Sequence, residues 1–446
     1  AIGGVFFAAF GGQPMIILLT TVPLAIYIKV IYRISESLGY DFFAMYACVG
    51  LWCQFFLVIY AATELCSLMK LATRSAEEMF SLFIAIAFAV ESVRAIHTSF
   101  IDNYLSCINT TSVAQPQNFS LLNQKLLTNT TELIYPQIKN GCNRDTFILY
   151  LLLMFGTLWV ALFLYNFRKT PYLTRSRREW LADYALPASV LIMSFLGEYT
   201  FFKIDKDRFR ERADVSLLKI PEFWRLSWQA IFVCFILGFF LSFLFYMDQN
   251  ICSSIIYLLS LFLNMFLSVM GLPWMHGALP HSPLHVRALA DVEERVAQGH
   301  VHEVIMNVRE TRLATLIAHI LILASTFFLL PYLQLIPTSV LHGLFLYMAF
   351  TSLSGNEMVE RLLLLITEQQ AYPPTHYIRR VPQRKVHLFT TCQLIQLIIL
   401  CAVGFNPYPF IEMVFPIVCF CFLPIRHILI PRIIDYKYLD ALDGRH

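Results

Sequence analysis

Long apolar runs separated by short polar stretches dominate the hydrophobic pattern of this chain. A helix of about 20 apolar residues crosses the hydrocarbon core of a bilayer, and most of these runs approach that length. After a first apolar run at 1–10, the predicted spans are 42–69, 76–100, 147–167, 183–202, 227–247, 251–270, 313–330, 337–351, 387–405 and 410–430. The pattern therefore predicts an all-α polytopic membrane protein. A further amphipathic segment, 357–370, is predicted to lie along the inner membrane interface.

Glycine and proline break two of the apolar segments. Gly11-Gly12-Gln13-Pro14 interrupts the first run, and Thr20-Thr21-Val22-Pro23 opens a new helix. The stretch 271–287 follows a span and carries three prolines and three histidines. Broken backbone at membrane depth is tolerated only inside protein or beside a wet cavity, and a half-helix N-terminus favours an anion. One such segment could be an ordinary loop, but a pair in corresponding halves predicts an inverted-repeat transporter.

Composition supports a membrane location and disfavours other classes of protein. The chain is 58% hydrophobic and only 14% charged, whereas soluble domains are about 25% charged. No nucleophile triad, phosphate-binding glycine loop, zinc spacing or nucleic-acid pattern rises above background. We therefore expect no enzyme activity, no cofactor, no bound metal and no nucleic-acid partner. Because the chain opens at Ala1 inside an apolar run, its N-terminus is expected to be missing from the sequence.

The placement of charge predicts the topology. Basic residues follow the span 147–167 and recur between 377 and 385, and the positive-inside rule places both clusters in the cytoplasm. The polar segment 101–144 is then extracellular, and it holds sequons at Asn109, Asn118 and Asn129. Cys107 and Cys142 bracket this segment and could form a disulfide there. We expect a glycosylated extracellular loop.

These spans predict a division of the chain in sequence order. Residues 1–100 hold the first-repeat spans, 101–144 the glycosylated loop, and 145–226 the spans and loops that end the first repeat. Residues 227–430 form the second repeat with its cytoplasmic loops, and 431–446 form a cytoplasmic tail. The charge-rich stretch 287–312 is expected to be a solvated cytoplasmic face.

Several motifs resemble the bicarbonate transporter family, which includes anion exchangers and sodium–bicarbonate cotransporters. They are Gly11-Gly12-Gln13-Pro14, Leu272-Pro273-Trp274, Asp248-Gln249 and Val308-Arg309-Glu310-Thr311-Arg312. The longer stretches PHSPLHVRAL at 280–289 and AYPPTHYIRRVPQRK at 371–385 are similar to its sodium/borate cotransporter branch, also called sodium bicarbonate transporter-like. The resemblance implies two inverted repeats of seven transmembrane spans, core and gate domains, and a homodimer. It also implies that the first span is absent from this chain and that two half-helices meet at the midplane.

One departure from the family pattern bears on substrate. The resemblance implies an arginine in anion-exchanging relatives at the position of His281. Arginine is always charged and grips an oxyanion through two bonds, whereas histidine titrates near neutrality. This favours a substrate linked to protons over bicarbonate. The resemblance to this branch implies an electrogenic H⁺ or OH⁻ transporter of the plasma membrane, basolateral in epithelia and stimulated by ammonia. Sodium-coupled transport of borate or bicarbonate is the alternative, and a cell-adhesion or structural protein that uses 101–144 is the alternative of another class.

The candidate ion-binding residues are Asp248, His281, Ser282, Thr21 and Glu91. Each has a plainer interpretation beside the functional one. Asp248 could be a charge at a span end, His281 an interfacial histidine, and Thr21 an ordinary helix cap. Glu91 lies one turn from Arg94 and could form a structural pair with it.

His276 and His285 are weaker candidates than His281, because core hydrogen bonding would satisfy either ring. Glu198, near the end of its span, is more typical of an interface residue than of a ligand.

Overall fold

The computed structural model describes residues 1–443 apart from 12–14, 64–72, 106–143, 209–219, 251–253, 278–281, 283–284, 287–288, 298–299, 354–355, 369–371 and 373–375. Several predicted features lie outside these ranges, namely Asn109, Asn118, Asn129, Cys107, Cys142 and His281.

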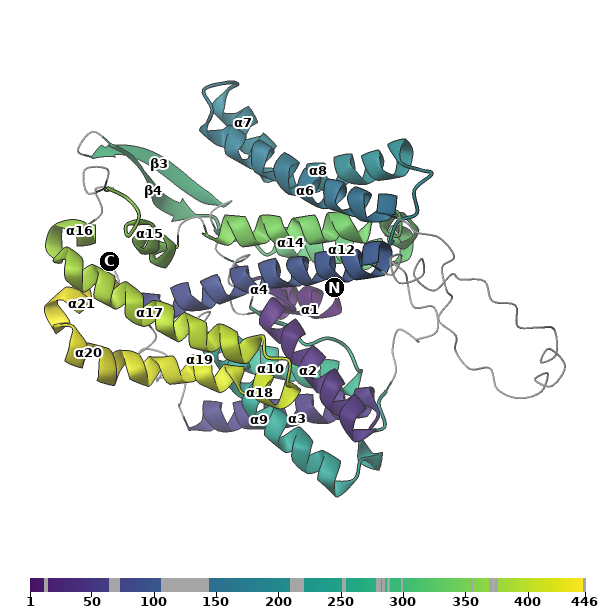
Figure 1. The fold of residues 1–446 in the computed structure, drawn as a ribbon. Helices are drawn as coiled ribbons and strands as arrows, with labels where there is room; N and C mark the ends of the chain where they lie inside the picture. The colour runs from purple at the N-terminus through teal and green to yellow at the C-terminus, as the bar shows by residue number, and fades with distance from the viewer. Residues whose placement is uncertain are drawn as a thin grey trace, which may run out of the picture. The chain divides into compact units, whose positions relative to one another are not determined.

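Helices make up most of the described chain (Figure 1). The longer ones are α1 Ile2–Phe10, α2 Val22–Leu38, α3 Phe42–Ala62, α4 Arg74–Phe100, α6 Arg144–Asn166, α7 Arg175–Asp183, α8 Ala185–Phe195, α9 Trp228–Asn250, α10 Ser254–Val269, α12 Leu313–Phe328, α14 Thr338–Leu353, α17 Gln383–Gly404, α19 Phe415–Pro424 and α21 Tyr436–Asp443. Shorter ones are α13 Leu330–Leu333, α15 Glu357–Leu363, α16 His376–Arg380, α18 Pro409–Glu412 and α20 Ile430–Ile433. Over the described residues, six helices are long and apolar enough to span a membrane, or seven if α7 and α8 form one span bent by 58°.

The bend between α7 and α8 has a local cause. The predicted span 183–202 corresponds to α8 and the π-helical turn Leu196–Thr200, and α7, which ends at Asp183, precedes it. Pro187 lies in the first turn of α8 and has no N–H to donate to the carbonyl of Asp183. A proline inside a helical run removes this bond, so the helix breaks one turn earlier.

Two compact units divide the chain. The first is Ala1–Ala87, Arg212–Leu330 and Thr351–His446, and the second is Phe88–Glu211 and Pro331–Phe350. Each unit is built from segments that are discontinuous in the sequence. The predicted division into repeats and membrane-facing loops is a different property, and it stays a prediction.

Close helix contacts at glycine build the first unit. A Cβ on Gly238 of α9 would lie 2.6 Å from Trp52 Cβ and 3.0 Å from the backbone of Cys53 in α3. A Cβ on Gly50 of α3 would lie 2.2 Å from Ser268 Oγ of α10. Small residues let membrane helices approach to backbone distance, so α9 and α10 pack directly on α3.

The second unit packs α8 and α14 against α6. Leu149, Leu153, Met193 and Val340 form its buried apolar cluster. A Cβ on Gly343 of α14 would lie 2.6 Å from the carbonyl oxygen of Met154, so this contact also depends on glycine.

Two pairs of strands depart from the all-α expectation. β3 Ala290–Ala297 and β4 His300–Val308 form an antiparallel hairpin where 287–312 was expected to be a solvated charged face. Its register pairs Val292 with Ile305 and Val296 with Val301. Charged residues between these β-branched ones hid the strand pattern. The second pair, β1 Leu18–Leu19 and β2 His276–Gly277, joins the two broken segments.

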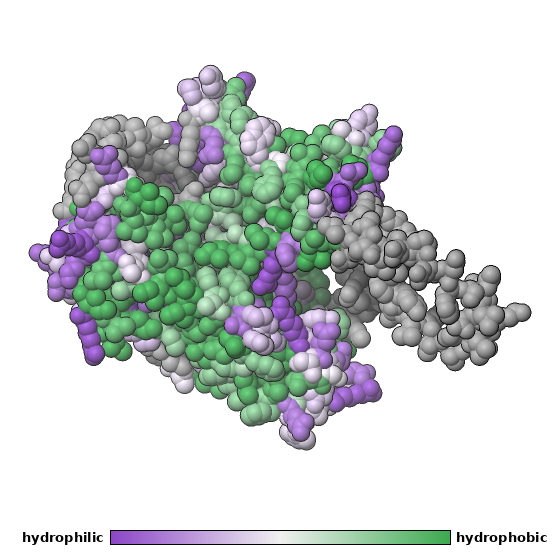
Figure 2. All heavy atoms as spheres, viewed as in Figure 1, coloured by the Kyte–Doolittle hydropathy of each residue, from purple (hydrophilic) through white to green (hydrophobic). Residues whose placement is uncertain are grey.

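Apolar side chains cover much of the visible surface (Figure 2). Large hydrophobic residues are exposed on several helices, including Phe55, Trp159, Leu191, Phe232, Ile317 and Ile398. Lipid replaces water around a membrane span, so such a surface is expected here.

The amphipathic segment predicted at 357–370 is helical over a shorter range. Helix α15 ends at Leu363, and Asn356 caps it by accepting hydrogen bonds from Met358 N and Val359 N. Met358 and Arg361 are buried, whereas Leu363 and Ile366 are exposed. One side of this segment therefore anchors in the protein.

Candidate functional site

The two broken segments meet in the first unit. β1 and β2 pair antiparallel, with Leu18 opposite Gly277 and Leu19 opposite His276. Each strand lies next to a helix end, since Pro23 is in the first turn of α2 and Gly271 ends the α10 turn with a φ of 64°. Unpaired backbone N–H and C=O groups are costly in an apolar surrounding. Here the backbone groups of the two broken segments pair with each other. The prediction that the two segments meet is confirmed.

Three side chains reinforce this junction. Thr20 Oγ1 donates to the carbonyl oxygen of Trp274 over 2.8 Å. Thr21 Oγ1 lies 2.8 Å from His276 Nε2. The backbone N–H of Ile17 donates to Ser282 Oγ over 3.2 Å. Thr21 and Ser282, both predicted as site residues, therefore lie at the junction.

Side chains from α3 and α10 fix the second broken segment. Trp274 is fully buried and stacks on Tyr46 with ring centroids 4.0 Å apart. Its indole donates to Ser268 Oγ over 2.8 Å, and its backbone N–H donates to the Tyr46 hydroxyl over 3.1 Å. Asn264 accepts from Met275 N over 2.8 Å and donates to Met275 O over 2.7 Å. These bonds define a single backbone path, which an ordinary connecting loop does not need.

His276 is the titratable side chain at the junction. It is 0% exposed, and its ring packs edge-on to Phe245 with centroids 5.4 Å apart. Its Nδ1 lies 3.3 Å from the carbonyl oxygen of Gly277. A proton on Nδ1 would satisfy that contact and leave Nε2 to accept from the Thr21 hydroxyl. The sequence ranked His276 below His281. The position of His276 in the broken stretch, next to Gly277, was the one sequence feature that indicated a place at the junction.

The N-terminus of α2 faces the same junction. Thr21 is its N-cap residue, yet the side chain makes no capping bond, because the hydroxyl contacts His276 instead. The first-turn N–H groups of α2 therefore lack a cap from this residue, and such groups favour an anion.

The other predicted site residues lie elsewhere or are only partly described. Asp248 is in the last turn of α9, near the helix end at Asn250, and its side chain is outside the described set. His281 is outside it entirely. Glu91 lies in the part of α4 that belongs to the second unit. His285 is half-buried, and its Nε2 has no hydrogen-bond partner within the described part of the chain.

Across the described residues, no group of three or more His, Cys, Asp and Glu could hold a metal ion. The junction itself offers hydroxyls, backbone N–H groups and an imidazole, which suit a proton, a hydroxide or a small oxyanion.

Known proteins resemble the chain over its full length. The family model described as the HCO3⁻ transporter integral membrane domain matches residues 1–446. Solute carrier family 4 member 11 of Mus musculus is 45% identical over 100% of this chain and 55% of its own length. Band 3 anion transport protein of Rattus norvegicus is 26% identical over 100% of the chain and 48% of its own length. This chain therefore spans about half the length of the curated relatives it matches.

A solved structure supports the same fold. The transmembrane domain of a cyanobacterium bicarbonate transporter, BicA, aligns with a TM-score of 0.54 at 13% identity. The alignment covers 94% of this chain and 88% of that one. The family match and this likeness confirm the predicted transporter fold and the resemblance drawn from the motifs.

Proposed function

Because the chain belongs to the HCO3⁻ transporter integral membrane domain family, we propose that it is the transport domain of an electrogenic H⁺ or OH⁻ transporter. We place it in the plasma membrane, basolateral in epithelia, as a homodimer whose flux ammonia stimulates. The transported species crosses where β1 and β2 join the two half-segments, at Thr21, His276 and Ser282.

The contact between Thr21 Oγ1 and His276 Nε2 carries this proposal. An imidazole accepts a proton at one ring nitrogen and releases one from the other, and a hydroxyl beside it can pass the proton on. Both groups lie where the backbone of the two segments is broken. His281, in place of the arginine implied for anion exchangers, supports the same assignment.

Sodium-coupled transport of borate or bicarbonate is the second candidate. The uncapped N-terminus of α2 favours it, because backbone N–H groups bind an oxyanion. Electrogenic sodium bicarbonate cotransporter 1 of Ambystoma tigrinum, 28% identical over 90% of this chain, bears sodium and bicarbonate in its name. A cell-adhesion role based on the segment 101–144 gains nothing from broken spans, and we place it last.

The experiment reconstitutes the purified protein in liposomes and measures reversal potentials under separate pH, sodium and bicarbonate gradients. We expect the potential to follow the pH gradient alone, whereas the second candidate requires a sodium-dependent flux at constant pH. The double variant His281→Ala with Asp248→Asn should lower the proton current to about a tenth or less. The matched control is His97→Ala with Asp183→Asn, two exposed residues of the second unit. A wild-type current in the first double variant would remove the assignment of these two residues.

A further inference from the structure

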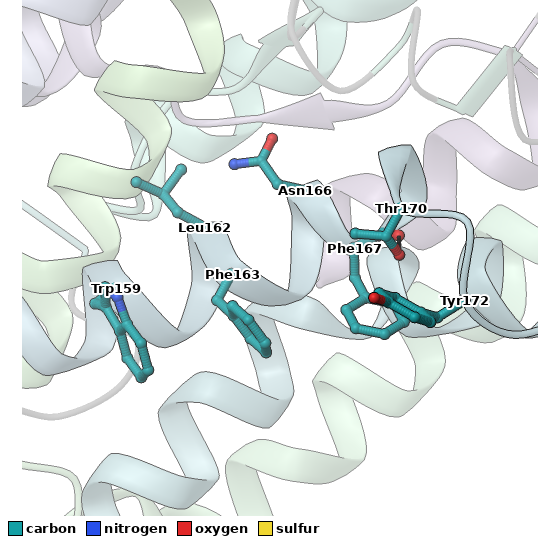
Figure 3. Close-up of a pocket in the computed structure, with 7 residues that line it drawn as sticks. All are labelled: Trp159, Leu162, Phe163, Asn166, Phe167, Thr170 and Tyr172. Carbon is teal, nitrogen blue, oxygen red and sulfur yellow. Dashed lines mark hydrogen bonds between the residues drawn. The ribbon is translucent and has the colours of Figure 1, made fainter.

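A pocket of about 520 Å³ lies at one end of α6 in the second unit (Figure 3). Its volume is within the range of small-molecule sites. The residues that line it come from α6, from the following turn Phe167–Lys169, and from the loop toward α7. It takes no part in the junction described above.

Two adjacent side-chain stripes form its walls. Trp159, Phe163 and Phe167 repeat at every fourth position and make an aromatic stripe, which Figure 3 shows along one side of the helix. Trp159 stacks on Phe163 with centroids 5.7 Å apart, and Phe163 meets Phe167 edge-on at 6.1 Å. Leu162, Asn166 and Thr170 form the neighbouring stripe. The lining is therefore mostly apolar, and its two polar side chains, Asn166 and Thr170, lie toward the end of α6 beside Phe167 and Tyr172.

The pocket also follows the depth of the membrane. Helix α6 has 23 residues, so it is about 35 Å long and crosses the whole hydrocarbon core. Trp159 and Phe163 lie in the last two turns of α6, on the side of the hydrocarbon core, whereas Tyr172 lies beyond the end of the helix. Trp159 is 67% exposed and Tyr172 69% exposed, so the protein itself leaves these rings uncovered.

One arginine contacts the polar end of the pocket, and others lie near it in the sequence. Arg178 of α7 donates from Nη1 to the carbonyl oxygen of Thr170, a pocket residue. Arg168, Arg175 and Arg177 lie in the same short stretch of the sequence. Arg175 pairs with Glu179 over 2.9 Å, and Arg168 also has a partner. Cations in the first turn of a helix oppose its dipole, and the first turn of α7 holds no acid. An anion at this rim would relieve that repulsion.

We propose that this pocket binds an anionic phospholipid of the cytoplasmic leaflet. One acyl chain lies between the two stripes of α6, and the phosphate lies at Arg178 and its neighbouring arginines. The graded polarity of the pocket and its positive rim match the two ends of such a lipid. A second copy of this chain fits less well, because a two-fold contact would set the same arginines against each other.

The test counts lipids retained by the full chain. Native mass spectrometry of protein from nanodiscs of phosphatidylserine and phosphatidylcholine should show selective retention of phosphatidylserine. Arg178→Gln keeps a donor for Thr170 but loses the charge, and we expect it to weaken this retention about fivefold. Arg178→Lys keeps the charge and should retain the lipid. The matched control is Lys203→Gln, which removes an exposed charge elsewhere in the same unit.

A second variant fills the pocket without changing charge. Asn166→Trp should displace the acyl chain and reduce phosphatidylserine retention as much as Arg178→Gln does. Full retention in Asn166→Trp would show that the arginines attract lipid without the pocket, and would overturn the proposal. Loss of a dimer in Asn166→Trp with unchanged lipid retention would assign the pocket to a second copy of the chain instead, with the same consequence.

Discussion

At the scale of single residues, the hydroxyl of Thr21 serves the junction and not the helix that it begins. An N-cap threonine commonly accepts a bond from its own first turn, but this one contacts a buried imidazole. This hydroxyl therefore links the start of α2 to the second broken segment and does not cap its own helix.

Replacing Thr21 with valine tests this directly. Thr21→Val keeps the branched shape and removes the O–H that His276 contacts, so we expect the proton current in liposomes to fall to about a tenth. The free energy of unfolding should fall by only about 1–3 kcal/mol, the cost of disturbing one buried hydrogen bond. Thr21→Ser retains the hydroxyl and is the control. A wild-type current in Thr21→Val, with Thr21→Ser also unchanged, would show that the contact only holds the backbone.

The sequence named two of the residues that the structure brings together at the junction, and it gave a third little weight. Thr21 and Ser282 could be predicted because glycine and proline mark the breaks, and polar side chains beside a break line whatever site it forms. His276 was ranked below His281, and its contact with Thr21 joins residues 255 apart in the sequence, which no periodicity shows. Asp248, His281 and Glu91 stay predictions.

At the scale of elements, a buried charge network joins α4, α15 and α17 in the first unit. Arg361 is 1% exposed, and its guanidinium donates to Glu78 Oε2 over 2.6 Å and to Glu357 Oε2 over 3.2 Å. It also donates to Gln393 Oε1 over 3.2 Å and lies over the ring of Phe389. Burying these charges is favourable only while every partner is present.

Removing the arginine alone should therefore destabilise the protein strongly. Arg361→Met leaves Glu78 and Glu357 to share Arg74 as their remaining cation, which lies 3.4 Å from Glu78 Oε1 and 2.5 Å from Glu357 Oε1. One carboxylate is then in excess in a buried setting, and we expect a loss of about 3 kcal/mol. The measurement is thermal unfolding of the detergent-purified protein, with Arg225→Gln as the control. Arg225 pairs with Glu222 at an exposed position, and such pairs contribute at most about 1 kcal/mol.

A compensating variant separates charge from packing. Adding Glu78→Gln to Arg361→Met should recover part of the stability, because one uncompensated charge is gone. Equal unfolding temperatures for Arg361→Met and Arg225→Gln would contradict a stabilising role for this network.

The elements themselves were largely predictable, with one physical exception. Apolar length sets the membrane helices, so most spans were placed correctly. The hairpin of β3 and β4 was missed because strand pairing depends on a partner, and charges interrupt its apolar positions.

At the scale of the whole molecule, the sequence predicted the fold class but not its two units. Apolar spans and paired breaks are local features, and they identify an inverted-repeat transporter. The units require packing between distant segments, since Pro331–Phe350 joins Phe88–Glu211 while its neighbours in sequence belong to the other unit. The unit to which Pro331–Phe350 belongs depends on how side chains fit together, as at Gly343 against Met154. A hydropathy pattern carries no information on such contacts.

The predicted topology links the lipid pocket to the charge distribution and can be tested on intact cells. Anionic lipids concentrate in the cytoplasmic leaflet. The arginines at the start of α7, Arg175, Arg177 and Arg178, can therefore bind such a lipid only if α7 begins on the cytoplasmic side. Ser176→Cys introduces a thiol at an exposed position of α7. We expect a membrane-permeant maleimide to label this thiol. Labelling by an impermeant maleimide, after subtraction of the wild-type background, should be at least about tenfold weaker.

Glycosylation of the predicted extracellular loop tests the same topology from the other side of the membrane. Changing Asn109, Asn118 and Asn129 together to glutamine should remove the glycosidase-sensitive mass of the protein, because all three sequons lie in the predicted extracellular loop. A wild-type protein without glycosidase-sensitive mass, together with a Ser176→Cys thiol that reacts with the impermeant reagent, would invert the orientation. In that case the arginines would face the leaflet poor in anionic lipid, and their charge would have to serve another ligand.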